Sequence, residues 1–222
     1  MVQEWGDLPF FESGEWDVIQ EKLNDIPATQ LCPLPEHLLA AFDVCPLDTV
    51  RVAIFGQDPY PLQSLCTGVA FSIPHHQRTF PPTLSQIFDE YCSDLHYPRP
   101  TSGDLTPWCK QGVLLWNTIP SLEMGKSLSH EGWVEYQLLN QQMVEELSKR
   151  GVLFVLIGSI AKRYIRRWVD TSNSDVIETS HPSPRAQLRK NVEHPFKGSR
   201  IFSTINDYLC RAGGPPIDWR LA

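Results

Sequence analysis

The 222-residue chain has no hydrophobic run long enough to cross a membrane, no internal repeat and no low-complexity tract. Its acidic N-terminus lacks the charged-then-apolar pattern of a secretory signal. With 41% hydrophobic residues, the chain is long enough to bury one sizeable core. We therefore expect residues 1–222 to form one soluble intracellular domain, cytoplasmic or, if the source is eukaryotic or a nuclear virus, nuclear.

The motifs of several common protein classes are also missing. None of the six cysteines forms a CxxC pair, and no histidine lies at zinc-ligand spacing from a cysteine pair. Nothing else in the sequence indicates secretion, so buried reduced thiols are favoured over disulfides. The absence of GxGxxG and of GxxxxGK[ST] argues against dinucleotide-binding and P-loop folds. We expect no metal.

The formal net charge of −7 argues against nucleic acid as a partner, but the charge is unevenly distributed. Residues 1–150 hold 8 Lys or Arg against 20 Asp or Glu, whereas residues 151–222 hold 11 against 6. This asymmetry favours a polyanion-binding face formed by the second segment. The alternatives are the ordinary unevenness of a protein surface and, for the basic segment 159–170, a solvated helix face.

Apolar strand-like segments alternate with amphipathic helix-like ones, which is typical of a parallel sheet flanked by helices. We expect a single-domain α/β fold with a central, mostly parallel four-stranded sheet. Residues 1–48 form a helical N-terminal part, and residues 49–222 carry the motifs. The expected strands are 49–55, 112–118, 151–159 and 175–180, with a short additional strand at 68–74. The expected helices are two pieces within 13–45, a helix from Thr83 to residue 95 that Thr83 caps, and 133–150, 159–170 and 199–212. The segments 119–132 and 181–197 are expected loops.

Each of the four main strands runs into a polar loop. The first, VAIFGQDPYP, has Gly56 at a sharp turn and Asp58 between an amide and a phenol. The other strand ends are LLWNT, LIGS and TSHPSP. Because the carboxyl ends of parallel strands meet at one edge of a sheet, these loops should line one crevice. Its residues would be Gln57, Asp58, Tyr60, Asn117, Ser159, His181 and Ser183. For the first loop alone, a Pro-rich turn with a capping Asp is an equal alternative.

These side chains suit a pocket for a planar base inside a phosphate-binding rim. Asp58 and His181 can perform acid-base chemistry or stabilise charge, and Asn117 offers the donors and the acceptor that match an amide-like edge. Phe71 could stack on a planar ring. The GS and HPSP segments can bind phosphates through backbone N–H groups. Each residue also has a structural alternative, as a turn asparagine, a structural histidine or a core phenylalanine, so the inference depends on their convergence.

Eight motifs resemble, in order and in separation, those of the first family of uracil-DNA glycosylases. They are GQDPYP (56–61), GVAFS (68–72), PPTL (81–84), WCKQGVLLWNT (108–118), SH…GW (129–133), LIGS (156–159), HPSP (181–184) and PIDW (216–219). GQDPY with a downstream LLxN and HPSP is highly specific, whereas GS or PIDW alone is weak. The resemblance covers nearly all of the chain from about residue 50 onward.

The resemblance implies hydrolysis of the bond between uracil and deoxyribose in DNA, which leaves an abasic site. Asp58 would stabilise the cationic sugar and orient the attacking water, and His181 would donate a hydrogen bond to uracil O2 as negative charge develops there. The nucleotide would first be rotated out of the duplex, as glycosylases do. This mechanism requires no metal or cofactor.

The resemblance also implies which residues contact the base and the DNA backbone. Gln57 would hold the uracil edge, Tyr60 would exclude the methyl group of thymine, and Phe71 would stack on the base. Asn117 would recognise N3 and O4 of uracil, where cytosine presents the wrong donor pattern. The phosphate contacts would come from Pro81, Pro82, Thr83, Ser159 and Ser183.

Two positions depart from the family pattern. Pro61 follows Tyr60 where most members have His, which changes the loop that positions water. Arg185 follows HPSP where the family usually has an apolar wedge that fills the gap left by the flipped base. Arginine can insert, stack through its planar group and pair with phosphate, so we expect Arg185 to be the wedge.

Two other functions stay open from the sequence. The same scaffold could serve as a DNA-binding accessory or processivity subunit of a replication complex, an alternative motivated by Pro61 and Arg185. An enzyme for other bases is opposed by Tyr60, which closes the C5 side of the pocket. The expected partner is uracil-containing DNA, single- or double-stranded, with a proteinaceous inhibitor or a replication protein as a further partner. We expect a monomer that does not bind membranes.

Overall fold

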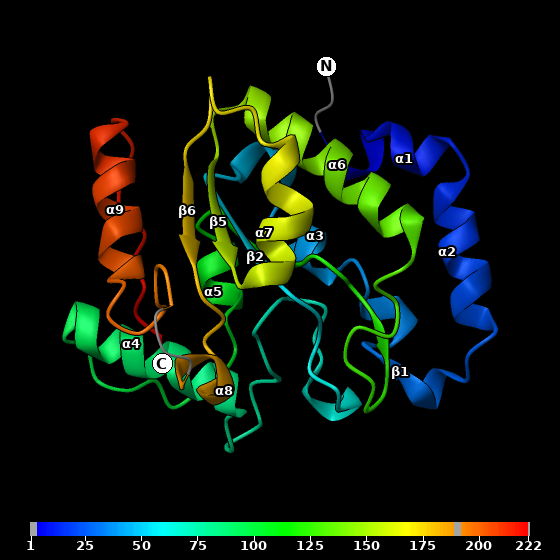
Figure 1. Ribbon diagram of the computed structural model, residues 1–222, viewed down its shortest axis with the longest axis horizontal. Coiled ribbons are helices and arrows are strands. Elements are labelled where there is room, and N and C mark those ends of the chain that lie inside the picture. Colours follow the sequence, from blue (N-terminus) through cyan, green and yellow to red (C-terminus); the bar gives the residue numbers. More distant parts are fainter. Residues whose placement is uncertain (1–3, 189–191, 222) are drawn as a thin grey trace.

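A four-stranded parallel sheet lies at the centre of the protein (Figure 1). The computed structural model describes residues 4–188 and 192–221. The strands run in the order β3-β2-β5-β6 and each neighbouring pair is parallel. Their bounds are β2 Val52–Gly56, β3 Val113–Asn117, β5 Leu153–Ile157 and β6 Val176–Thr179. The expected α/β fold with a central parallel sheet is confirmed.

Helices flank the sheet, and a short antiparallel ribbon joins β1 Leu31–Cys32 to β4 Leu122–Glu123. The helix α7 packs on β2 and β5, while α1 and α2 pack on α6, and α4 packs on α9 (Figure 1). The α-helices are α1 Pro9–Glu12, α2 Glu15–Asn24, α3 Ala40–Val44, α4 Pro82–Leu95, α5 Thr106–Cys109, α6 Val134–Lys149, α7 Ser159–Ile165, α8 Pro184–Gln187 and α9 Ile201–Arg211. In the described part of the chain, no helix is both long and apolar enough to cross a membrane.

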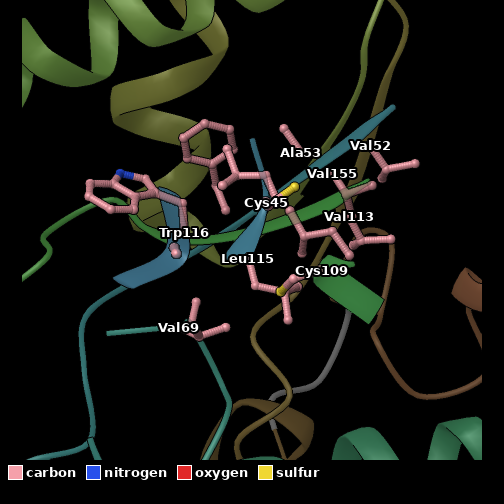
Figure 2. Close-up of a cluster of buried hydrophobic side chains, with 14 of the residues drawn as sticks. Cys45, Val52, Ala53, Val69, Cys109, Val113, Leu115, Trp116 and Val155 are labelled. Atoms are coloured by element: carbon pink, nitrogen blue, oxygen red, sulfur yellow. The ribbon is translucent and has the colours of Figure 1, made fainter. Parts of the chain in front are cut away.

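Three of the four central strands are buried on both faces, as continuous apolar runs between layers of helices predict. Every residue of β2, β3 and β5 is buried. Figure 2 shows their side chains packed among Cys45, Val69 and Cys109, which lie outside the sheet in the sequence. Burial raises the pKa of the Cys45 and Cys109 thiols, so both stay protonated in the core. All six cysteines are free, in agreement with the expectation of reduced thiols.

Aromatic rings tie both ends of the chain to the same core. Trp5 stacks on Phe42 with 4.4 Å between ring centroids, and Phe42 stacks on Trp116 of β3 at 4.7 Å. Trp219, from the PIDW motif, packs edge-on against Trp108 at 5.2 Å, and its backbone carbonyl accepts the Trp108 indole N–H at 2.9 Å. The N-terminal helices and the C-terminal tail are therefore parts of one hydrophobic core with the sheet.

The expected short strand at 68–74 is wrong. Gly68 and Phe71 have φ values of 77° and 65°, in the left-handed region. A β-strand requires φ well below zero, so two such residues three positions apart exclude an extended conformation. The segment instead makes a tight turn that carries Phe71 toward the end of β2.

Three boundaries also differ from expectation. Thr83 does not cap α4, because the helix starts at Pro82 with Pro81 as its N-cap residue; proline suits a first helical position, where no N–H is needed. The expected loop 119–132 contains β4, and the expected loop 181–197 contains α8. Residues 189–191 of that second loop lie outside the described residues.

Hydrogen bonds join the start and the end of the segment that follows β6. The hydroxyl oxygen of Ser180 accepts the N–H of Phe196 at 3.0 Å. Nearby, the buried carboxylate of Glu90 on α4 accepts the N–H groups of Gly198 and Arg200 at 2.6 and 2.7 Å. The HPSP segment is therefore anchored on both sides, although it lies in a long connection.

A buried histidine links the SH…GW motif to α6. The Oγ of Ser121 lies 2.8 Å from His130 Nδ1 and 2.5 Å from the Tyr136 hydroxyl, and the His130 ring stacks on Trp133 at 4.0 Å. Burial lowers the pKa of His130 to about 4. His130 is therefore neutral in the folded protein at pH 5, whereas in the unfolded chain it is protonated below its ordinary pKa of 6.5.

Stability is consequently expected to fall as the pH drops from 7 to 5, because the unfolded state then binds a proton at His130 that the folded state does not. The linkage corresponds to about 2 kcal/mol over this range. Urea unfolding of the protein and of His130→Asn at both pH values measures it. The variant should be less stable at pH 7 but should lose about 2 kcal/mol less on acidification; equal losses would contradict the assignment to His130.

Candidate active site

A cavity of about 740 Å³ opens where the four central strands end. Its volume falls in the range of small-ligand pockets. Most of the site residues predicted from the sequence line it, namely Gln57, Asp58, Tyr60, Phe71, Thr83, Asn117, Ser159, His181, Ser183 and Arg185. Pro81 and Pro82 are not among the lining residues. Residues far apart in the sequence therefore meet at one site because parallel strands end at a common edge.

The end of β2 brings an aromatic ring and an amide together. A Cβ atom at Gly56 would lie 2.8 Å from the Phe71 ring and 2.9 Å from Asn117 Oδ1, so only glycine leaves room for both side chains. Gly56 is also opposite Asn117 in the sheet register. The left-handed backbone of Phe71 costs on the order of 1–3 kcal/mol, and the Tyr60 hydroxyl, which donates to the Phe71 carbonyl at 2.8 Å, helps to hold it.

The Asn117 amide is nearly buried, with 8% of the residue exposed. Among the described residues, its side chain makes no hydrogen bond within the protein. The backbone beside it is fixed: the Thr118 hydroxyl donates to Gly56 O at 2.7 Å, and Asn140 Nδ2 donates to Thr118 O at 2.8 Å. The Asn117 amide lines the cavity with its donors and acceptor free of the protein's own groups, so it can bind a polar ligand there.

The carboxylate of Asp58 is held by three donors. Oδ1 accepts Gln57 Nε2–H at 3.0 Å, and Oδ2 accepts the Ser127 hydroxyl at 2.6 Å and the Leu128 N–H at 2.8 Å. Pro59, which follows Asp58, is buried and further restricts the loop. An oriented carboxylate at the cavity wall can stabilise a cation or position a water molecule.

His181 lies on the opposite strand end as a neutral hydrogen-bond donor. Its Nδ1 accepts the Ser183 N–H at 3.0 Å, which places the ring proton on Nε2. Burial lowers the pKa of His181, and the charge of Asp58 opposes this shift only in part. Gly158 suits this approach, since its φ of 91° is strained for other residues and a Cβ there would lie a tight 3.2 Å from the Cβ of His181. A neutral imidazole N–H can stabilise negative charge that develops on a ligand oxygen.

The pocket wall at Tyr60 is uncharged. Burial raises the pKa of Tyr60, so its phenol stays protonated and keeps donating to the Phe71 carbonyl. The Cys66 thiol lies next to it and donates to the Tyr60 carbonyl at 3.0 Å. Tyr60 is thus a fixed steric boundary rather than an acid or base at neutral pH.

Backbone N–H groups and basic side chains line the rim. Ser159 is the first residue of α7, and the Ser183 hydroxyl accepts the Ala186 N–H at 3.4 Å as the N-cap of α8. The basic side chains of α7 are less available for binding phosphate than the sequence suggests, because two of them pair with carboxylates. Lys162 lies 3.4 Å from Glu178, and Arg163 pairs with Glu131. Among the described residues, Lys162 and Arg185 are the basic side chains that line the cavity.

Sequence reasoning missed the contribution of the segment before the SH…GW motif. Ser127 and Leu128 line the cavity and contact Asp58, yet they lie in a segment that the sequence predicts only as loop. No local pattern signals their role, because the contact joins residues about 70 positions apart in the sequence. Within the described residues, no group of three or more His, Cys, Asp or Glu side chains could hold a metal ion.

Fold and site together define a class of protein: an α/β protein whose sheet ends at a pocket walled by a carboxylate, an amide and a neutral imidazole. Residues 42–210 match the family model of the uracil DNA glycosylase superfamily, and the chain belongs to that superfamily. A uracil-DNA glycosylase of Parafrankia sp. (strain EAN1pec) is 40% identical over 192 residues, which cover 85% of this chain and 80% of that protein. One of Ruegeria sp. (strain TM1040) is 37% identical over 98% of this chain and 89% of that protein.

Solved structures have the same fold. The mimivirus uracil-DNA glycosylase superimposes with a TM-score of 0.78 at 23% sequence identity, over 93% of this chain and 86% of that one. A mimivirus variant in complex with UGI gives a TM-score of 0.76 at 24% identity, over 93% of this chain and 88% of that one.

Proposed function

We propose that this protein is a family-one uracil-DNA glycosylase that hydrolyses the N-glycosidic bond of flipped-out deoxyuridine in base excision repair. The observation that carries the proposal is the meeting of Asp58, Phe71, Asn117 and His181 at one cavity on four separate segments of the chain. Relatives named uracil-DNA glycosylase align over most of the chain. The products are free uracil and an abasic site, and the protein acts in the compartment that holds the DNA.

Catalysis follows from the two charges that bond cleavage creates. As the bond breaks, the sugar becomes an oxocarbenium-like cation and the base becomes a uracil anion. The Asp58 carboxylate stabilises the cation and orients the water that attacks C1′, while the Nε2–H of His181 donates to uracil O2. A preorganised donor of this kind contributes about 3–4 kcal/mol. The oxygen of the water forms the new bond to C1′ as the bond to the base breaks, and the electron pair of that bond leaves with uracil. The proton that the water loses passes to the Asp58 carboxylate and ends on the uracil anion, so the products are neutral uracil and the abasic sugar.

Base selection follows from the walls of the pocket. Phe71 stacks on the ring, and Gln57 holds one edge of the uracil. The Asn117 amide accepts N3–H and donates to O4, a pattern that cytosine reverses. Tyr60 stands beside C5 and leaves no room for the thymine methyl group. The rim formed by Ser159, Ser183 and the Thr83 segment holds the phosphates, with Pro81 and Pro82 shaping that segment.

The direct test is uracil release from an oligonucleotide, followed by alkaline cleavage of the abasic site. We expect cleavage at the uracil position in single- and double-stranded DNA, and because each step uses a side chain of this protein, activity should persist in EDTA. Rates should fall with rising salt, since phosphate contacts release counterions. No cleavage in EDTA would contradict the proposal.

Tyr60→Ala is expected to admit thymine. Removing the ring opens the C5 side, and discrimination by one methyl group in a pocket corresponds to about 10–200-fold in kcat/KM. The ratio of uracil to thymine excision measures the change. Tyr60→Phe is the matched control: it loses the hydrogen bond to the Phe71 carbonyl but keeps the ring, so it should still reject thymine. If both variants reject thymine equally, Tyr60 does not face C5.

Arg185→Ala is expected to slow excision from duplex DNA about tenfold, with a smaller loss on single strands. The exposed guanidinium at the cavity rim would fill the gap in the base stack that only a duplex has, a stacking contact of about 1–2 kcal/mol. Single-turnover rates on matched substrates measure this. Equal losses on both substrates would assign Arg185 to phosphate binding alone.

We propose that a proteinaceous inhibitor can occupy the DNA-binding face of this protein. The support is the likeness in fold to a mimivirus enzyme variant that was solved in complex with UGI. Addition of UGI to the excision assay tests this, and inhibition at an equimolar ratio is the expected result.

A further inference from the structure

The turn between β4 and the SH…GW motif is attached to the loop that carries Asp58. At one end of this turn, the Gly125 N–H donates to the Pro61 carbonyl at 3.0 Å. At the other end, Ser127 and Leu128 both donate to Asp58 Oδ2, at 2.6 and 2.8 Å. The turn itself is stiffened by Ser129, whose hydroxyl oxygen accepts the Glu123 N–H at 2.8 Å.

Ser127 belongs to a closed triangle of hydrogen bonds. Its hydroxyl donates to Asp58 Oδ2, while its oxygen accepts Gln57 Nε2–H at 3.3 Å. The same Gln57 nitrogen donates to the other carboxylate oxygen, Oδ1, at 3.0 Å. Ser127 thus contacts the carboxylate directly and also supports the side chain that contacts its second oxygen.

The neighbouring residues cannot replace this hydroxyl. Pro61 has no polar side chain, and its carbonyl already accepts the Gly125 N–H. The Leu128 N–H reaches Asp58 because Leu128 has a left-handed backbone, with φ of 63°. A carboxylate with one backbone donor alone can still rotate about its side-chain torsions, whereas a second donor on Oδ2 and one on Oδ1 fix its plane.

We propose that Ser127 is a positioning residue that holds Asp58 in its reactive orientation. This inference rests on the proposed role of Asp58 in catalysis. Ser127 and Leu128 both donate to Oδ2, whereas Oδ1 accepts Gln57 alone, so Oδ1 keeps more acceptor capacity for the attacking water and the sugar cation. A charge-assisted hydrogen bond that acts on the transition state lowers the rate constant of the chemical step when it is lost, without weakening DNA binding.

The test is a double-mutant cycle in single-turnover excision of uracil from an oligonucleotide, with DNA affinity measured separately on uracil-free DNA. Ser127→Ala is expected to lower the single-turnover rate constant about 10–30-fold and to leave affinity within about twofold. Ser127→Thr keeps the hydroxyl and should recover most of the rate. In an Asp58→Ala background, Ser127→Ala should have no further effect, because the group through which Ser127 acts is gone.

Each other outcome overturns one statement. A weaker affinity with an unchanged rate constant would make Ser127 a DNA contact. Full additivity of Ser127→Ala and Asp58→Ala would show that Ser127 does not act through Asp58. An Asp58→Ala variant with the wild-type rate would instead overturn the proposed catalytic role of Asp58, whatever Ser127 does. Ser129→Ala removes a hydrogen bond within the same turn but no contact with Asp58. It should lower the melting temperature and leave the single-turnover rate constant closer to the wild-type value than Ser127→Ala does.

Discussion

Asp58→Asn is expected to lower the rate of uracil excision by about 10²–10³-fold, the range for removal of one preorganised electrostatic contact. The substitution keeps the shape of the side chain but removes the negative charge that faces the sugar cation. It also places an amide where Ser127 and Leu128 both donate hydrogen bonds to Asp58 Oδ2. Single-turnover kinetics on a uracil-containing oligonucleotide measure the loss.

DNA binding provides the control for this variant. The negative charge of Asp58 repels phosphate, so Asp58→Asn should bind DNA at least as tightly as the wild type while it excises slowly. Thermal unfolding shows whether the fold is intact. A variant that binds DNA normally and retains half of the wild-type rate would remove Asp58 from the chemistry and, with it, the role proposed for Ser127.

Asn117→Asp is expected to shift excision from uracil toward cytosine. A carboxylate can no longer donate to uracil O4, but it can accept from the exocyclic amine of cytosine. Sites built to hydrogen-bond a particular edge discriminate by on the order of 10⁴-fold, and the ratio of uracil to cytosine kcat/KM should fall by a large part of this. The fixed backbone at Thr118 and Gly56 keeps the new side chain in place.

The matched control is Asn117→Ala, which removes the amide without reversing its donors. It should lose uracil excision and gain none for cytosine. Oligonucleotides with a single uracil or cytosine in the same context make the two rates comparable. If Asn117→Asp and Asn117→Ala behave alike, the side chain at this position does not recognise the base edge.

The sequence predicted the parallel sheet and the meeting of its strand ends because both follow from local patterns. Apolar runs such as 153–157 are long and unambiguous, and polar residues follow them directly. The strand predicted at 68–74 failed because positive φ values at Gly68 and Phe71 override β-propensity there. That conformation is set by packing of the Phe71 ring against Gly56, which no window of sequence contains.

Contacts between distant parts of the sequence also explain why the charge of α7 was overestimated and why the turn that holds Ser127 was missed. Charge counting favoured a polyanion-binding face, but Glu178 and Glu131, distant in the sequence, pair with Lys162 and Arg163. The contact between Ser127 and Asp58 joins residues on different segments and has no periodic signature. Ion pairs and hydrogen bonds between distant residues therefore determine which charged groups and hydroxyl groups are free to act at the cavity.

We infer that the four strand ends form one pocket for an extrahelical uracil. A crystal structure with DNA that carries an uncleavable deoxyuridine analogue would show this pocket occupied. We expect the base stacked on Phe71, its N3–O4 edge on the Asn117 amide, O2 at the Nε2 of His181 and the sugar beside Asp58. A base that stays in the duplex, or one that binds away from Asn117 and His181, would contradict it.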